Sequence, residues 1–115
     1  MLIFDDEPHI CKAVELVLGG DGLETDVANS PPEYFRKLKE EDPDLVLLDV
    51  VMPMSGVDVL KQTRKMKPNV KVVMLTVVGS EAFKEHYKEL GAVDYINKPF
   101  NNNDLVKRVK RIVCG

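Results

Sequence analysis

The stretch Leu45-Val46-Leu47-Leu48-Asp49-Val50-Val51-Met52-Pro53 decides the fold of this chain. Its four leading apolar residues follow one another without alternation and stop at the carboxylate of Asp49. A short continuous apolar run is typical of a strand buried on both faces, as the central strands of parallel sheets are. Ligands of open α/β sheets bind beyond the carboxyl ends of the strands. Asp49 is therefore the first candidate for a functional residue.

The length and composition of the chain predict one compact domain that spans residues 1–115. A chain of 115 residues, of which 44% are hydrophobic, is long enough for one compact domain and too short for two. The net charge is −3, and the two signs are interspersed. We therefore expect no direct binding to nucleic acid. One basic cluster is interpreted as the solvated face of the last helix; it consists of Lys107, Arg108, Lys110 and Arg111.

The chain also lacks the sequence features of membrane and disulfide-rich proteins. No apolar run approaches the length of a membrane span, and no signal peptide opens the chain. The two cysteines, Cys11 and Cys114, form no C-x-x-C motif, and in a chain of this size they favour reduced thiols. We therefore predict a cytoplasmic protein without membrane contact.

Strand-like and helix-like patterns alternate five times along the chain. Such alternation predicts an α/β fold with a parallel sheet, helices on both faces and right-handed crossovers. Five strands in a chain of this length fit the doubly wound order 2-1-3-4-5, with five helices. The second strand alternates apolar and polar residues, which suits an edge position. The expected strands cover residues 1–4, 23–28, 45–49, 70–75 and 93–97.

Local signals mark several helix ends. Ser30-Pro31-Pro32-Glu33 reads as a capping box with proline just inside it. The next helical pattern covers residues 56–66, and Gly91 is expected to stop the fourth helix. Residues 102–104, Asn-Asn-Asp, offer several caps for the last helix.

Polar residues stand where the strands of this sheet are expected to end. They are Asp5 and Asp6 at the end of the first strand, Asp49 at the end of the third, Thr76 at the end of the fourth and Lys98 at the end of the fifth. The first and third strands are neighbours in the predicted order, so three carboxylates share one crevice. Two like charges about 4 Å apart repel by about 4 kcal/mol at an intermediate dielectric. A hard divalent cation bound through oxygen, such as Mg²⁺, would relieve this repulsion.

Four motifs in this order resemble those of the receiver domain of two-component response regulators, and the resemblance covers nearly the whole chain. The motifs are Phe4-Asp5-Asp6-Glu7-Pro8, Leu48-Asp49-Val50-Val51-Met52-Pro53, Leu75-Thr76 and Tyr95-Ile96-Asn97-Lys98-Pro99-Phe100. The resemblance implies a flavodoxin-like fold. It also implies that this is a single phosphoacceptor domain, which at most catalyses its own phosphorylation and dephosphorylation.

The resemblance assigns a role to each matching residue. Asp49 matches the phosphoacceptor, and Asp5 and Asp6 match the acidic pair that holds Mg²⁺, Asp6 directly and Asp5 through water. Val51 stands where a backbone carbonyl joins the metal. Thr76 matches the switch hydroxyl, Tyr95 the aromatic residue that turns inward with it, and Lys98 the ammonium that contacts the phosphoryl oxygens.

The implied partners are a sensor histidine kinase or phosphotransfer protein as the phosphoryl donor, and a downstream output domain or protein. The chain has no nucleotide-binding G-x-x-x-x-G-K-[ST] motif, so the donor must come from outside. Phosphorylation would reshape the surface of the fourth helix, fifth strand and fifth helix. A homodimer formed through the last helices is kept as an alternative to a monomer.

Two other functions are weighed against this one. A Mg²⁺-dependent phosphatase could also use an aspartyl phosphate, but such enzymes carry an Asp-x-Asp motif, whereas Asp5 and Asp6 are adjacent here. The other alternative is a receiver-like interaction module that accepts no phosphate. The chain departs from the family in three places: a short first strand, one residue fewer between Pro53 and Gly56, and an end directly after the last helix. The last departure fits a stand-alone receiver or one cut from a longer protein.

Overall fold

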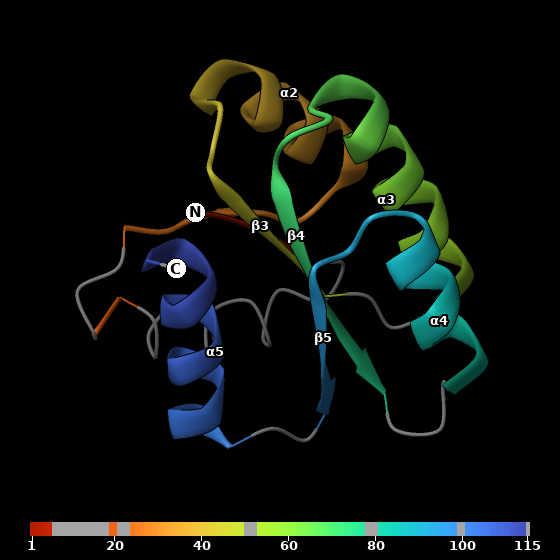
Figure 1. Ribbon diagram of the computed structural model, residues 1–115. Helices are drawn as coiled ribbons and strands as arrows, with labels where there is room; N and C mark the ends of the chain where they lie inside the picture. Colours follow the sequence, from red (N-terminus) through yellow and green to blue (C-terminus); the bar gives the residue numbers. More distant parts are fainter. Residues whose placement is uncertain (6–18, 21–23, 50–52, 78–80, 99–100, 115) are drawn as a thin grey trace.

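The computed structural model describes residues 1–5, 19–20, 24–49, 53–77, 81–98 and 101–114. Within them, five parallel strands form one sheet in the order β2-β1-β3-β4-β5 (Figure 1). The strands are β1 (Leu2–Asp5), β2 (Asp26–Ala28), β3 (Leu45–Asp49), β4 (Lys71–Val77) and β5 (Asp94–Lys98). The predicted doubly wound sheet is confirmed, including the edge position of the second strand.

Helices cover both faces of this sheet. The described helices are α2 (Pro31–Glu41), α3 (Pro53–Met66), α4 (Glu81–Glu89) and α5 (Asn102–Cys114). Among the described helices, α5 lies on one face of the sheet, while α2, α3 and α4 lie together on the other (Figure 1). The first predicted helix, which follows β1 in the sequence, lies outside the described residues.

The central strand β3 explains why its apolar run has no alternation. Leu45 and Leu47 pack in the cluster that includes the α5 residues Leu105 and Val109. The two residues between and after them, Val46 and Leu48, belong to the cluster on the opposite face. The side chains of these four apolar residues are all buried, with at most 1% of their surface exposed. A strand covered on both faces needs apolar residues at every position.

The sheet therefore separates two hydrophobic cores. The smaller core, beneath α5, contains Ile3, Leu45, Leu47, Val73, Leu75, Ile96, Leu105 and Val109. The larger core, beneath α2, α3 and α4, includes Leu2, Phe4, Tyr34, Leu38, Val46, Leu48, Val57, Leu60, Val72, Met74 and Tyr87. Neighbouring residues of one strand contribute to different cores because successive side chains of a strand point to opposite faces.

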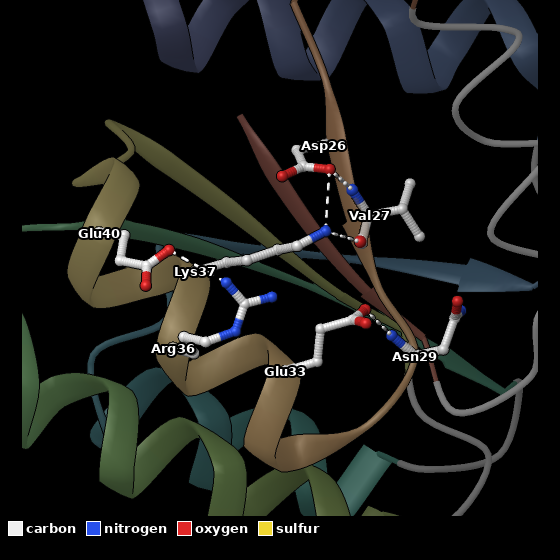
Figure 2. Close-up of polar contacts among 7 residues, drawn as sticks. All are labelled: Asp26, Val27, Asn29, Glu33, Arg36, Lys37 and Glu40. Atoms are coloured by element: carbon white, nitrogen blue, oxygen red, sulfur yellow. Dashed lines mark hydrogen bonds and ion pairs between the residues drawn. The ribbon is translucent and has the colours of Figure 1, made fainter.

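The start of α2 follows the predicted capping box with one difference. The Ser30 hydroxyl accepts the backbone N–H of Glu33 at 3.4 Å. The Glu33 carboxylate reaches back to the N–H of Asn29 at 3.1 Å, one residue before the cap (Figure 2). In an ideal capping box it would bind the cap residue itself. The difference ties Asn29, which follows β2, to the first turn of α2.

Two further helix starts differ from the prediction. Helix α3 begins at Pro53, three residues before the predicted start at Gly56, because proline is well suited to the first turn, where its missing N–H is no loss. Helix α5 is capped by Asn101 and not by one of the polar residues 102–104. The Asn101 side-chain oxygen accepts the N–H groups of Asn103 at 2.8 Å and Asp104 at 3.3 Å.

The predicted stop at Gly91 is confirmed. Gly91 has a φ of +102°, a conformation that L side chains rarely adopt. The guanidinium of Arg64, at the end of α3, donates to the Gly91 carbonyl at 2.8 Å and to the Pro68 carbonyl at 2.7 Å. The backbone conformation favours glycine there, and a Cβ at position 91 would also lie 2.7 Å from Arg64 Nε and displace that side chain.

None of the helices that the structure describes combines the length and apolar character needed to cross a bilayer.

Candidate functional site at the carboxyl edge of the sheet

The register of the strands brings the predicted site residues to one edge of the sheet. Asp5 and Asp49 are direct partners in the neighbouring strands β1 and β3. Asp49 is in turn the partner of Leu75 in β4, so Thr76 lies one step beyond it. Adjacent strands of a sheet lie about 4.8 Å apart. The backbone therefore places Asp5, Asp49 and Thr76 side by side along three consecutive strand ends.

Lys98 extends this row to the fifth strand. Thr76 pairs with Asn97, and Val77 pairs with Lys98, so Lys98 stands one register step beyond Thr76. Four of the five strands thus end within a few residues of one another. The structure places the backbones of Asp5, Asp49, Thr76 and Lys98 at this edge of the sheet, and β4 runs one residue beyond the end predicted at Thr76. The side chains of Asp49, Thr76 and Lys98, and the whole of Asp6 and Val51, lie outside what the structure describes.

Asp5 is the one acidic side chain of the predicted metal site that the structure describes. It is fully buried, with 0% of its surface exposed. A buried carboxylate is costly unless hydrogen bonds or a cation compensate its charge. The backbone carbonyl of Asp5 accepts the side-chain amide of Asn29 at 3.3 Å. A buried carboxylate whose register partner is a second aspartate fits the oxygen-donor set that Mg²⁺ prefers.

Among the residues whose side chains are described, no three His, Cys, Asp or Glu form a metal-binding group. This result does not bear on the predicted magnesium site, because Asp6 and the Asp49 side chain are not among those residues. The donor chemistry and the register are therefore the observations on which the predicted site stands.

Tyr95, the predicted aromatic switch residue, is the second residue of β5, and its ring lies beside Lys88 of α4. Its half-buried ring packs against the larger core, and the ammonium of Lys88 lies 5.0 Å from the ring centroid. That distance is within the range of a cation–π interaction. Its backbone is also held, since its N–H donates to the Asp94 carboxylate at 2.8 Å and its carbonyl accepts from Arg108 at 3.1 Å.

Arg108 is a residue that the sequence interpretation missed. Lys107, Lys110 and Arg111 of the basic cluster are exposed, as predicted, but Arg108 is half-buried and reaches back to β5. Its guanidinium lies 3.2 Å from the carboxylate of Asp104 and 3.7 Å from that of Asp94. Assigning Arg108 to a solvated face was therefore wrong. The spacing of four residues from Asp104 was the signal that could have identified it.

The chain matches the family model described as "Response regulator receiver domain" over residues 1–110. It is similar to the transcriptional regulatory protein CpxR homolog of Haemophilus influenzae, with 39% identity over 98% of this chain and 49% of the relative. It is also similar to the alkaline phosphatase synthesis transcriptional regulatory protein PhoP of Bacillus subtilis, with 37% identity over 98% of this chain and 48% of the relative. The chain thus spans about half the length of these relatives.

A solved structure supports the same relationship. The receiver domain of NtrX from Brucella abortus superposes with a TM-score of 0.88 and 28% sequence identity. The match covers 97% of this chain and 96% of that structure.

Proposed function

The chain belongs to the response regulator receiver domain family, and from this premise we propose that Asp49 accepts a phosphoryl group from a sensor histidine kinase or phosphotransfer protein. The observation that carries the proposal is the pairing of Asp5 with Asp49 in β1 and β3. These two strands flank the point where the strand order of the sheet reverses. Doubly wound sheets bind their ligands at this point, beyond the carboxyl ends of the strands.

The proposed reaction uses the Asp49 carboxylate as a nucleophile. One of its oxygens attacks the phosphorus, the bond from phosphorus to the donor breaks, and the donor leaves with the bonding electron pair. The product is an acyl phosphate, which carboxylate nucleophiles can form. In phosphoryl transfer the protein acts mainly by positioning the groups and stabilising charge. The register of β1 and β3 supplies the positioning in this proposal.

Asp5, Asp6, the Asp49 carboxylate and the Val51 backbone carbonyl would hold Mg²⁺. When bound, the cation offsets the charge of the carboxylates and of the incoming phosphoryl oxygens. Lys98 would contact the same oxygens from the other side. In this proposal Asp5 keeps its carboxylate buried at the base of the site, which is consistent with its 0% exposure.

Thr76 and Tyr95 would convert phosphorylation into a change of surface. A phosphoryl group brings about −1.5 to −2 charges and strong acceptor oxygens, which the Thr76 hydroxyl can approach. Tyr95 would then turn inward and leave its place beside Lys88. The face formed by α4, β5 and α5 would change shape and serve an output domain or protein, or a second copy of the chain. We propose a cytoplasmic location and no direct contact of this domain with nucleic acid.

Incubation with acetyl phosphate and Mg²⁺, followed by intact mass measurement, tests this function. We expect one phosphoryl adduct on the wild type, which EDTA prevents, and none on Asp49→Asn. An unmodified wild type would indicate a receiver-like module that accepts no phosphate. Steady turnover of a small phosphate ester would instead indicate the phosphatase, which neither the family match nor the relatives favour.

A further inference from the structure

Asn29 connects the edge strand to the acidic end of β1. Its side-chain amide donates to the backbone carbonyl of Asp5 at 3.3 Å. Its own backbone N–H donates to the Glu33 carboxylate at 3.1 Å (Figure 2). One residue is therefore held by the first turn of α2 through its backbone, and holds the end of β1 through its side chain.

The sheet ladder explains why a side chain is needed here. The pairing of β1 with β2 ends at Phe4 and Ala28, one residue before Asp5. Beyond Ala28 the chain leaves the sheet, because the Ser30 carbonyl already accepts the N–H of Tyr34 in the first turn of α2. The backbone of β2 thus ends before it can pair with Asp5. The Asn29 side-chain amide, and not a backbone N–H of β2, donates to the Asp5 carbonyl.

The carbonyl held by Asn29 has consequences for the next residue. The Asp5 oxygen belongs to the peptide unit that joins Asp5 to Asp6, and peptide units are planar. A hydrogen bond to this oxygen therefore restrains the orientation of the peptide plane that leads to Asp6. We propose that Asn29 is a positioning residue for Mg²⁺ binding, which acts by orienting the peptide unit between the two carboxylates. This inference rests on the proposed function.

Groups that orient metal ligands commonly change metal affinity by about 10–100-fold when they are removed. Asn29 is exposed and its bond to Asp5 is long, so we expect a smaller effect. Asn29→Ala should weaken Mg²⁺ binding by roughly three- to tenfold. The phosphorylation rate at saturating Mg²⁺ should stay close to that of the wild type, because Asp49 lies two strands away from β2.

The matched control is Ser30→Ala. It removes the helix cap next to Asn29 and should destabilise α2, but it leaves the bond to Asp5 in place. The Mg²⁺ dissociation constant is measured by NMR titration of each protein with MgCl₂, and thermal unfolding is followed in parallel. We expect both variants to lower the melting temperature and only Asn29→Ala to raise the dissociation constant.

Four outcomes of this titration are possible. A raised dissociation constant in Asn29→Ala, with Ser30→Ala like the wild type, supports the positioning role. Equal dissociation constants in all three proteins overturn it while the proposed function stands, and a parallel loss in both variants assigns the effect to α2 stability and also overturns it. Failure of the wild type to bind Mg²⁺ removes the proposed function itself, and the inference with it.

Discussion

The two edge strands of the sheet, β2 and β5, are sealed by the same arrangement of side chains. In β2 the Asp26 carboxylate accepts the N–H of Val27 at 2.8 Å, and Lys37 donates to the Val27 carbonyl at 2.7 Å (Figure 2). Lys37 also pairs with Asp26 at 3.1 Å. The Asp26 N–H donates to the carbonyl of Met1, the residue before β1, so the backbone N–H and carbonyl of the next residue, Val27, point away from β1. We call these contacts of Asp26 and Lys37 with the Val27 backbone the β2 cap. The β2 cap covers backbone groups that an open edge strand would expose to another chain.

The cap on β5 repeats this pattern with different residues. Asp94 accepts the N–H of Tyr95, and Arg108, from the helix that follows the strand, donates to the Tyr95 carbonyl. Arg108 also lies 3.7 Å from the Asp94 carboxylate. In both strands the first residue is an aspartate that accepts the N–H of the next residue, and a cation from the following helix donates to the carbonyl of that same residue.

The two strand caps differ in the residue whose backbone they bind and in the exposure of the cation. The β2 cap holds Val27, and the Lys37 side chain that closes it is only 19% exposed. The β5 cap holds Tyr95, the proposed switch residue, and its Arg108 side chain is 40% exposed and shared with Asp104. The Lys37 side chain at β2 is thus less exposed than the Arg108 side chain at β5, where the contacts bind the residue that we propose as the switch.

Loss of Lys37 should have the largest effect on stability. Lys37→Met keeps the aliphatic stem but leaves the Val27 carbonyl and the Asp26 carboxylate without the ammonium. We expect the free energy of unfolding to fall by about 1–1.5 kcal/mol, the upper part of the usual range for one hydrogen bond, because the site is only partly buried and the Asp26 side chain is 42% exposed. Urea unfolding measures this, with Lys39→Met on the exposed side of α2 as the control.

The same variant tests whether the cap protects the edge. We expect Lys37→Met to associate with itself at high concentration in analytical ultracentrifugation, because an uncapped edge strand can pair with another chain. If Lys37→Met matches Lys39→Met in both measurements, the contacts at β2 do not act as a cap.

Loss of Arg108 should lower the free energy of unfolding less than loss of Lys37 does. Its side chain is 40% exposed, so water screens its ion pairs, and we expect Arg108→Met to lower the free energy of unfolding by about 0.5–1 kcal/mol. Hydrogen exchange of the Tyr95 amide should accelerate at the same time, because Asp94 is less firmly held. Arg111→Met, on the exposed face of α5, is the control. Unchanged Tyr95 exchange would show that Arg108 does not secure β5.

The smallest effect is expected from Glu41 and depends on pH. A hydrogen bond between the side chains of Glu41 and Asp26 lowers the pKa of Asp26 and raises the pKa of Glu41. The lowered Asp26 pKa contributes stability above its ordinary value of 3.8, and this is lost as the pH falls through the folded value. The raised Glu41 pKa contributes stability below its ordinary value of 4.5, and this is lost as the pH rises through the folded value.

Glu41→Gln should therefore match the wild type in acid and become slightly more stable as the pH rises towards neutral. The glutamine amide can still donate to Asp26 but carries no charge to repel it. Urea unfolding over this pH range measures the difference. Glu40→Gln, which breaks the exposed pair with Arg36, should have the opposite sign at neutral pH. A Glu41→Gln curve parallel to the wild type at every pH would contradict the coupling with Asp26.

The sequence was sufficient for features that depend on neighbouring residues or on strand order. The unbroken apolar run of β3 predicted burial on both faces, and the order of the strands predicted that Asp5 and Asp49 would be neighbours. The parallel register then followed from the fold class. These predictions succeeded because backbone geometry leaves few alternatives once the strands are identified.

Contacts made by long side chains across the fold could not be predicted in this way. Lys37 and Arg108 reach backbone carbonyls 10 and 13 residues earlier in the chain, and Asn29 reaches a carbonyl 24 residues earlier. Such contacts depend on how each helix docks beside the sheet, which no periodicity specifies. The replacement of the predicted α5 caps by Asn101 has a similar origin, since several consecutive asparagines offer equivalent caps.

Locating the phosphoryl group within the chain tests the central claim most directly, that the strand register makes Asp49 the acceptor beside Asp5. The protein is treated with acetyl phosphate and Mg²⁺ and then reduced with borohydride, which converts an aspartyl phosphate into homoserine. Tandem mass spectrometry of the peptides then identifies the converted residue. Our account predicts homoserine at position 49 alone. Conversion at position 5 or 6, or at no position, would contradict it.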